Sequence, residues 1–204
     1  MILRNTTPKP VLALVFAAAS LCAAPSYAET DAQLMASGQW RDPATGLIWM
    51  RCSIGQRWTG STCSGTPIEL NWQDANDSFQ LFNQDGFAGR KNWRLPKIEE
   101  LVTIRRCSNG WGNEIKTIGN LTINMGVYKA TLPNGRSVPQ RCADGSRRPT
   151  LDTRIFPNTP DHWYWSASPY AYSYGGAWVV YFYNGAGDNL RYNNGHVRAV
   201  RAGQ

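Results

Sequence analysis

Hydrophobic periodicity predicts one long helix in the first half of the chain. Asn71 is a favourable helix-capping residue, and the apolar residues Trp72, Ala75, Phe79 and Phe82 that follow it fall on one stripe at helical spacing. A helix with a single apolar stripe buries that stripe against another element. We therefore expect this helix to pack on a sheet.

A second, shorter helix is expected after a brief strand. Residues 92–95 are typical of the strand, and Pro96 falls at the first turn of the helix, where proline is tolerated. Residues 98–105 continue the helical pattern. Glu99 and Glu100 lie near its positive end, where the helix dipole favours acidic side chains.

Strands are predicted before and after these helices. The turn sequence at residues 42–46 precedes an apolar run, residues 47–50, that is typical of a buried strand. Near the end of the chain, β-prone runs alternate with Asn-Gly turn signals, and strands are expected at residues 163–166, 177–183 and 196–201. In the last of these, Arg198 and Arg201 alternate with apolar residues, which predicts that both lie on the solvent face and pair there with carboxylates.

The middle of the chain lacks a regular pattern. Residues 107–150 contain scattered Gly, Asn and Pro, so we expect a long excursion with a hairpin at residues 132–136. Large aromatic residues inside predicted elements are more often core than site. The tryptophans expected in the core are Trp49, Trp72, Trp93 and Trp165.

The amino-terminal segment has the features of a secretory signal. Arg4 and Lys9 precede an apolar run of signal-core length, and small residues follow up to Ala28. The run is too short for a membrane span, and no later segment is long and apolar enough for one. We expect an exported protein of the periplasm, the cell surface or the secreted fraction. The predicted organisation is a signal peptide at 1–28, an N-terminal linker at 29–38 and one domain at 39–204.

Four cysteines follow the predicted signal: Cys52, Cys63, Cys107 and Cys142. In an exported chain an even set predicts disulfides, and three pairings are possible. We favour Cys52 with Cys63 and Cys107 with Cys142, because each pair brackets a stretch rich in Gly, Ser, Asn or Pro. A zinc site is the competing interpretation, but the cysteines lack close spacing, and the two histidines after the signal, His162 and His196, are isolated.

Positive charge is concentrated in one region. The formal net charge of the chain is +7, and residues 105–154 hold nine basic but only three acidic residues. Such a region can bind a polyanion. The first candidates for this role flank Cys142 and are Arg141, Arg147 and Arg148.

Tyrosines are concentrated near the carboxyl terminus. Six of the nine tyrosines lie between Tyr170 and Tyr192, among many Asn and Gly residues. Antibody loops use this composition for binding, because Tyr gives a large contact area at low entropic cost. The alternative, for Tyr181 and Tyr183, is cross-strand aromatic packing in an ordinary sheet. The candidate ligand-binding residues are Tyr170, Tyr172, Tyr174, Tyr181, Tyr183, Asn184, Asp188, Asn189, Arg191, Tyr192 and Asn193.

Several motifs in a fixed order carry a family resemblance. They are DPATGLIW at 42–49, RC at 51–52 with GQ at 55–56, WRLP at 93–96 with EL at 100–101, FPNT at 156–159, YWSAS at 164–168 and VRAVR at 197–201. With these motifs the chain resembles the Lcl C-terminal domain family from about Gln39 to Gly203.

The resemblance implies an α+β, C-type-lectin-like fold, in which two helices flank a small twisted antiparallel sheet with long loops. It also implies binding of sulfated glycosaminoglycans, and a trimer as in the best-known member. This chain has no collagen-like repeat, so its oligomeric state stays open. It also lacks the sequence signatures of calcium-dependent lectins.

The C-terminal segment has a second resemblance, to the variable region of target proteins that retroelements diversify. Adenine mutagenesis of asparagine codons cannot produce Lys, Glu, Gln or Met codons, and residues 167–203 contain none of these four residues. The resemblance implies a variable binding surface there.

These observations support three hypotheses about function. The first is an adhesion module that recognises an extracellular glycan or protein through the C-terminal tyrosine-rich loops. The second is binding of a sulfated polysaccharide through residues 105–154. The third is a cell-envelope enzyme, which we do not expect, because no nucleophile and base can be paired in the sequence. We predict no cofactor, no bound metal and no nucleic-acid partner.

Overall fold

The computed structural model describes residues 28–118, 121–127, 129–170, 176–190 and 193–203 of the 204-residue chain. The predicted signal peptide lies outside the described residues except for Ala28. Within the described ranges, no helix has the length and apolar character needed to cross a membrane.

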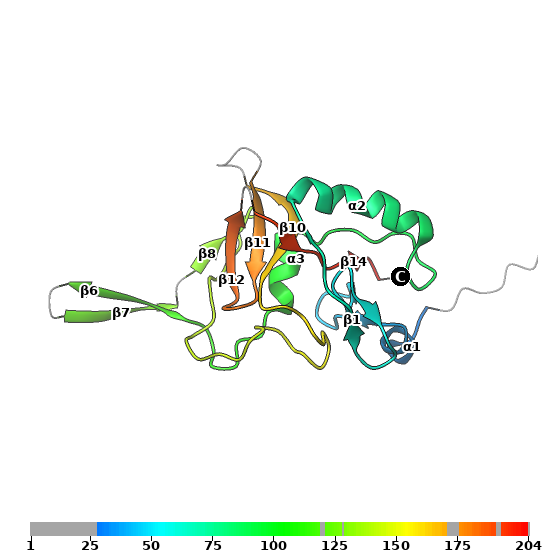
Figure 1. The fold of residues 1–204 in the computed structure, drawn as a ribbon. Helices are drawn as coiled ribbons and strands as arrows, with labels where there is room; N and C mark the ends of the chain where they lie inside the picture. Colours follow the sequence, from blue (N-terminus) through cyan, green and yellow to red (C-terminus); the bar gives the residue numbers. More distant parts are fainter. Residues whose placement is uncertain (1–27, 119–120, 128, 171–175, 191–192, 204) are drawn as a thin grey trace, which may run out of the picture.

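Short helices and short strands form a small α+β fold (Figure 1). The helices are α1 (Asp31–Ala36), α2 (Trp72–Asp85) and α3 (Ile98–Leu101), which a 3-10 turn, Val102–Ile104, extends. The strands are β1 (Gln39–Arg41), β2 (Ile48–Met50), β3 (Arg57–Trp58), β4 (Cys63–Ser64), β5 (Glu69–Leu70), β6 (Asn113–Ile118), β7 (Leu121–Val127), β8 (Lys129–Thr131), β9 (Ser137–Pro139), β10 (Trp163–Pro169), β11 (Ala177–Tyr181), β12 (Ala186–Leu190), β13 (Gly195–His196) and β14 (Val200–Arg201).

A five-stranded sheet organises the fold. Its strand order is β12-β11-β10-β13-β5, and its neighbouring strands are antiparallel except β10 and β13, which are parallel. The expectation of a purely antiparallel sheet is therefore wrong at this pair. The reason is the path of the chain: after edge strand β12 it re-enters the sheet on the other side of β10, where no hairpin dictates the direction.

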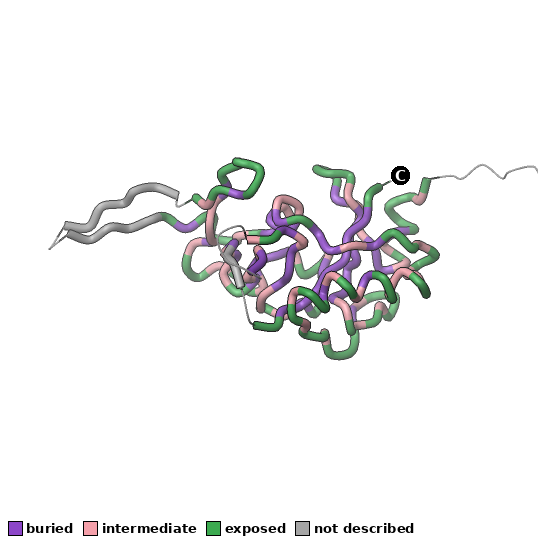
Figure 2. Tube along the Cα trace, turned by 90° about the horizontal axis from the view of Figure 1, so that it is seen from above, coloured by how far each residue is buried: buried purple, intermediate pink, exposed green. Residues whose placement is uncertain are grey.

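Hydrophobic clusters cover both faces of this sheet, and Figure 2 shows buried positions running through the middle of the molecule. One cluster joins α3 to Tyr164 and Val180, and the other joins α2 to Trp165 and Val179. Successive strand residues point to opposite faces, so α2 and α3 pack on different faces of the sheet. The expected arrangement of two helices flanking a sheet is present in this form.

The predicted core tryptophans lie close to where the sequence places them. Trp49, Trp93 and Trp165 are buried almost completely. Trp72 is partly buried, and its indole N–H donates a hydrogen bond of 2.9 Å to the backbone oxygen of Ser166 in β10. This bond fastens α2 to the sheet, as its apolar stripe predicts.

The two main predicted helices differ in how closely they match. Helix α2 begins after Asn71, whose side chain accepts a hydrogen bond from the backbone N–H of Asp74, as expected. Helix α3 is shorter than predicted and starts after Lys97, so Pro96 precedes the helix and is not in its first turn. The expected strand at 92–95 is reduced to a single bridge between β14 and Arg94.

The segment predicted as a linker, residues 29–38, contains helix α1. Thr30 and Gln33 form a reciprocal capping box, in which the Thr30 hydroxyl accepts from the Gln33 backbone N–H and the Gln33 side chain accepts from the Thr30 backbone N–H. Leu34 is fully buried and joins the core beneath α2. The single buried side chain of so short a helix gives too little periodicity to be recognised in the sequence.

A three-stranded sheet, β1-β2-β14, brings the beginning and the end of the described chain together. The expected strand at 196–201 is therefore two short strands, one in each sheet. Arg198 and Arg201 are 0% and 1% exposed, so their predicted place on a solvent face is wrong. A segment that crosses from one sheet to another is covered on both sides. Arg201 still pairs with a carboxylate, that of Glu29, at 2.6 Å.

Both favoured disulfides are confirmed. Cys52 bonds to Cys63 and Cys107 to Cys142, with Cα separations of 5.4 and 5.2 Å. The predicted hairpin at 132–136 is also confirmed and connects β8 to β9. A further hairpin, β6–β7, extends away from the body of the molecule in Figure 1. This hairpin was not predicted, because Gly and Asn interrupt the alternation of apolar and polar residues in its strands.

Candidate functional site

Three aromatic rings lie in a column at one end of the inner strand pair β10–β11 of the five-stranded sheet. Trp163 at the start of β10 faces Tyr181 at the end of β11, with ring centroids 4.0 Å apart and planes 18° apart. Tyr183 follows at 5.3 Å and 14°. Phe182 between the tyrosines points inward and is fully buried, so strand alternation turns both tyrosines the other way. We call Trp163, Tyr181 and Tyr183 the aromatic column.

An arginine covers the outer end of this column. The guanidinium carbon of Arg148 is 3.2 Å from the centroid of the Tyr183 ring, which is a cation–π contact. Neighbouring Thr150 donates hydrogen bonds from its backbone N–H and its hydroxyl to the Phe182 carbonyl oxygen, at 2.7 and 2.9 Å. These bonds hold the segment that carries Arg148 against the end of β11.

A disulfide supports the same corner of the molecule. The backbone N–H of Cys142 donates to the carbonyl oxygen of Asn184 at 2.8 Å. Gly185, at φ +71°, lies so close to the disulfide that an added Cβ would be 2.8 Å from the Cys142 Sγ. The turn after the aromatic column and the Cys107–Cys142 bridge are therefore packed directly together.

Arginines surround two adjoining hollows that share Arg148. The larger hollow, of about 580 Å³, also receives Arg106, Arg147 and Arg154. Asp152 lies in its wall and pairs with Arg154 at 2.7 Å, and this hydrogen bond keeps the pKa of Asp152 below its ordinary value despite partial burial. The other three arginines form no ion pair with any described residue, so the hollow carries an excess of positive charge.

The smaller hollow, of about 310 Å³, lies between the disulfide and the aromatic column. Arg141, Arg148, Tyr183 and Asn184 contribute to its lining. Arg141 pairs with Asp144 at 3.1 Å, and the Asp144 side chain is almost fully exposed. Arg141, Arg147 and Arg148 thus line one continuous basic surface together with Arg106, which we call the arginine surface.

Comparison with models of known protein families gives a match over most of the chain. The model of the Lcl C-terminal domain matches residues 38–201. The chain belongs to the Lcl C-terminal domain family. No curated protein and no solved structure matches it.

Only part of the predicted tyrosine site comes together in this Lcl C-terminal domain. Tyr181, Tyr183 and Asn184 lie at one corner, where the Asn184 side chain accepts a hydrogen bond from the Ala186 N–H and so stabilises the turn. Tyr170 follows the other end of β10 and packs edge-on against Trp178. It does not belong to the same site.

The other candidates are placed less fully. Asn193 is exposed just before β13, and Asp188 and Asn189 are placed only as members of strand β12. Four candidates lie outside the described residues: Tyr172, Tyr174, Arg191 and Tyr192. The retroelement-variable region is still a prediction.

The Lcl C-terminal domain also buries one residue of the basic region. Arg105 is 4% exposed and donates to backbone oxygens, including that of Gly185 at 2.7 Å. Burial lowers the pKa of Arg105 to about 10, with a smaller effect from Arg136. Arg105 therefore stabilises the corner from within and is not on the arginine surface.

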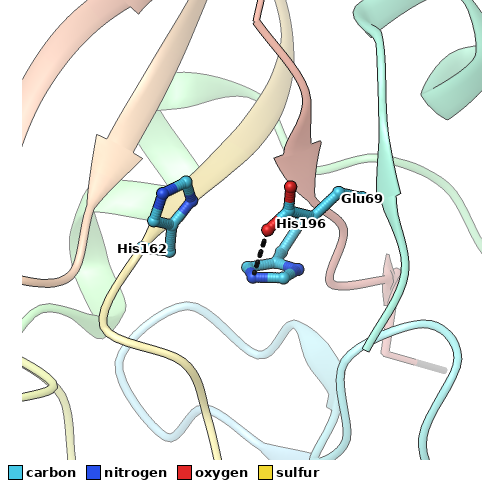
Figure 3. A group of neighbouring side chains, drawn as sticks. All are labelled: Glu69, His162 and His196. Atoms are coloured by element: carbon cyan, nitrogen blue, oxygen red, sulfur yellow. Dashed lines mark ion pairs between the residues drawn. The ribbon is translucent and has the colours of Figure 1, made fainter. Parts of the chain in front are cut away.

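Sequence reasoning missed Trp163 and treated the two histidines as isolated. Trp163 begins a strand that the sequence predicts, but its pairing with Tyr181 across the β10–β11 hairpin is seen only in the structure. The rings of His162 and His196 are 5.7 Å apart, so the view that they are isolated is wrong; Glu69 completes the group (Figure 3). Burial lowers the pKa of His196, and the Ile68 carbonyl and Glu69 oppose this effect only in part.

Proposed function

We propose that this domain is an exported binding module for a sulfated or carboxylated glycan, and that it acts by binding and not by catalysis. The observation that carries the proposal is the contact between Arg148 and Tyr183, because it joins the arginine surface to the aromatic column. The binding of sulfated glycosaminoglycans that the resemblance to the Lcl C-terminal domain family implies agrees with this choice.

Stacking prepares Arg148 for an anion. A guanidinium group carries its five N–H donors in its own plane, so an aromatic ring below it leaves those donors free at the edge. The ring also fixes the long side chain, which reduces the entropy lost when a ligand binds. Sulfate and carboxylate groups match the guanidinium fork through two parallel hydrogen bonds.

The aromatic column has a positioning role in this proposal. Its rings stack face to face, and Arg148 covers the outer face of Tyr183, so the tyrosine rings have little free face for a sugar. The tyrosines therefore hold Arg148 in place. The main ligand contacts are therefore proposed in the basic region and not in the C-terminal loops. The neighbouring arginines extend this surface, so that it can contact several groups of a polymer.

Binding of a heparin-derived oligosaccharide to the purified protein, measured by calorimetry, tests the proposal. Arg148→Ala should weaken binding roughly 10- to 150-fold, the loss expected for a charge-assisted hydrogen-bonded contact of about 1.5–3 kcal/mol. Arg57→Ala is the matched control, because Arg57 is exposed and has no ion pair among the described residues. Its effect should stay below about threefold, since salt screens distant charges.

The positioning role has its own pair of variants. Tyr183→Phe keeps the ring and should keep the affinity, whereas Tyr183→Leu removes it and should weaken binding nearly as much as Arg148→Ala. Affinity should fall steeply with salt, and it should be much weaker for the desulfated oligosaccharide, which keeps only its carboxylates. Equal effects of Arg148→Ala and Arg57→Ala, or affinity that does not depend on salt, would refute the proposal.

We also propose a C-type-lectin-like fold and an extracytoplasmic location. In support of the fold, β1 and β14 share a sheet through β2, so the ends of the domain meet while a long excursion leaves it. In support of the location, two disulfides brace the domain, and such bonds persist in oxidising compartments. Detection of both disulfides by mass spectrometry in protein taken from the native cell envelope tests the location.

A further inference from the structure

Strands β5 and β13 and the residue directly before β10 bring Glu69, His196 and His162 together from distant parts of the sequence. Glu69 in β5 is directly opposite His196 in β13 in an antiparallel pair. His196 is also the register partner of Tyr164 in β10, and His162 lies two residues before Tyr164. One ligand atom from each of the three side chains lies within 4.8 Å of the others (Figure 3). The backbone of the central sheet therefore positions the group.

The hydrogen bonds of His196 orient its ring. Its Nδ1 is 3.1 Å from the backbone oxygen of Ile68, an acceptor, so Nδ1 carries the proton of a neutral ring. The other nitrogen, Nε2, then has a free lone pair, and it faces the Glu69 Oε1 at 3.4 Å. A backbone carbonyl that fixes the tautomer in this way is the usual support of a metal-binding histidine.

A neutral His196 leaves two electron-pair donors facing each other. Nε2 of His196 and Oε1 of Glu69 face each other at 3.4 Å, a gap that a metal ion or a ring proton can bridge, and the His196 side chain is only 7% exposed. His162 adds a further unused group. Its Nδ1 is buried without a hydrogen-bond partner in the described part of the chain.

We propose that Glu69, His162 and His196 form a binding site for one divalent transition-metal ion, best matched by Zn²⁺. Two imidazoles and one carboxylate are a ligand set that zinc uses. Bonds of about 2.0–2.2 Å in a tetrahedron place ligand atoms roughly 3.3–3.6 Å apart, and the Glu69–His196 pair already has this separation. All three ligand atoms already lie within 4.8 Å of one another, so closing to this spacing needs a movement of roughly 1 Å.

Three protein ligands leave the fourth tetrahedral position for water or another ligand. The Glu69 side chain is 46% exposed, so solvent reaches the group from the side of this carboxylate. His162 also packs edge-on against Tyr181 at 6.2 Å, which places the site beside the aromatic column. Metal binding does not depend on the glycan proposal, because the two sites share no residue.

Zinc titration of the metal-free protein, purified without a histidine tag, tests the site. We expect one Zn²⁺ per chain by competition with a chromophoric chelator, and a visible absorption spectrum of tetrahedral type with Co²⁺. A roughly hundredfold excess of Mg²⁺ or Ca²⁺ should not displace zinc, because both ions prefer sites made of oxygen ligands.

Glu69→Gln and His162→Gln should each weaken zinc binding at least tenfold. Glu69 is half-exposed, so Glu69→Gln is expected to leave the fold intact, and circular dichroism without zinc checks this. Asp161→Asn is the matched control, because Asp161 is exposed and adjacent to His162 but outside the group. The proposal is overturned by absence of saturable zinc binding, by unchanged affinity in Glu69→Gln, or by an equal loss in Asp161→Asn.

Discussion

Arg198 has a fully buried guanidinium with no carboxylate partner among the described residues. It donates instead to the backbone oxygens of Met50 and Arg51 and to the hydroxyls of Ser53 and Thr159. Burial lowers the pKa of Arg198 from its ordinary value. Its removal therefore tests whether hydrogen bonds to neutral oxygens outweigh the cost of burying the charge.

Arg198→Met keeps most of the side-chain volume and removes every donor. The Ser53 and Thr159 hydroxyls keep other partners, at 2.6 Å to the Tyr164 hydroxyl and at 2.8 Å to a backbone oxygen. The two backbone oxygens of residues 50 and 51 lose this donor, at about 1–3 kcal/mol for each buried group left unsatisfied. We expect a loss of about 2–4 kcal/mol, and a further loss of about 2 kcal/mol or more in Arg198→Ala, which also leaves a cavity.

Urea unfolding with the disulfides intact, followed by tryptophan fluorescence, measures both losses. For a domain of this size, 2–4 kcal/mol corresponds to a drop of roughly 4–16 °C in the melting temperature. Arg57→Met is the control for charge removal and should change stability by less than about 0.5 kcal/mol. If Arg198→Met is as stable as the native protein, desolvation outweighs the hydrogen bonds and the reasoning is wrong.

Two further predictions concern pH and backbone conformation. Burial raises the pKa of Glu100, but hydrogen bonds, chiefly from Arg94, outweigh this and leave it below the ordinary value of 4.5. The stabilisation by ionised Glu100 is then complete above about pH 4.5 and is lost as pH falls through the lower folded-state pKa. Glu100→Gln should therefore flatten the acid side of a profile of melting temperature against pH. An unchanged profile would contradict this. Gly185→Ala should lower the free energy of unfolding in urea by about 2 kcal/mol or more, because φ is +71° and the added Cβ would meet Cys142. Gly135→Ala is the control, with a similar φ of +79° but open space around it, and should cost only about 1 kcal/mol. Equal losses would contradict the steric argument.

Local signals allowed the sequence to predict much of the frame. Asn71 and the stripe behind it define α2, because capping and periodicity act over a few neighbouring residues. The two disulfides followed from the composition of the loops that they close. The Asn-Gly turn before β12 was likewise visible, since φ near +71° at Gly185 favours glycine.

The candidate sites were only partly predictable, because they depend on contacts between segments far apart in the chain. Arg148 and Tyr183 were both proposed as binding residues, but for different hypotheses, and nothing local indicated that one covers the other. Glu69 was not proposed at all. An isolated glutamate acquires a role only when β13 is placed opposite β5.

The C-terminal crossing segment, residues 195–201, explains two wrong predictions together: the solvent-exposed arginines and the isolated histidines. A strand with alternating arginines was expected to have one solvent-exposed face, whereas this segment passes between two sheets and has no exposed face. His196 and Arg198 are separated by one apolar residue, and both contact Tyr164. The ring centroid of Tyr164 is 5.4 Å from that of His196 and 5.5 Å from the guanidinium carbon of Arg198. The buried charge of Arg198 and the proposed metal site therefore both pack against Tyr164. If Arg198→Met disturbs this packing, zinc affinity should fall in this variant even though Arg198 is not a ligand.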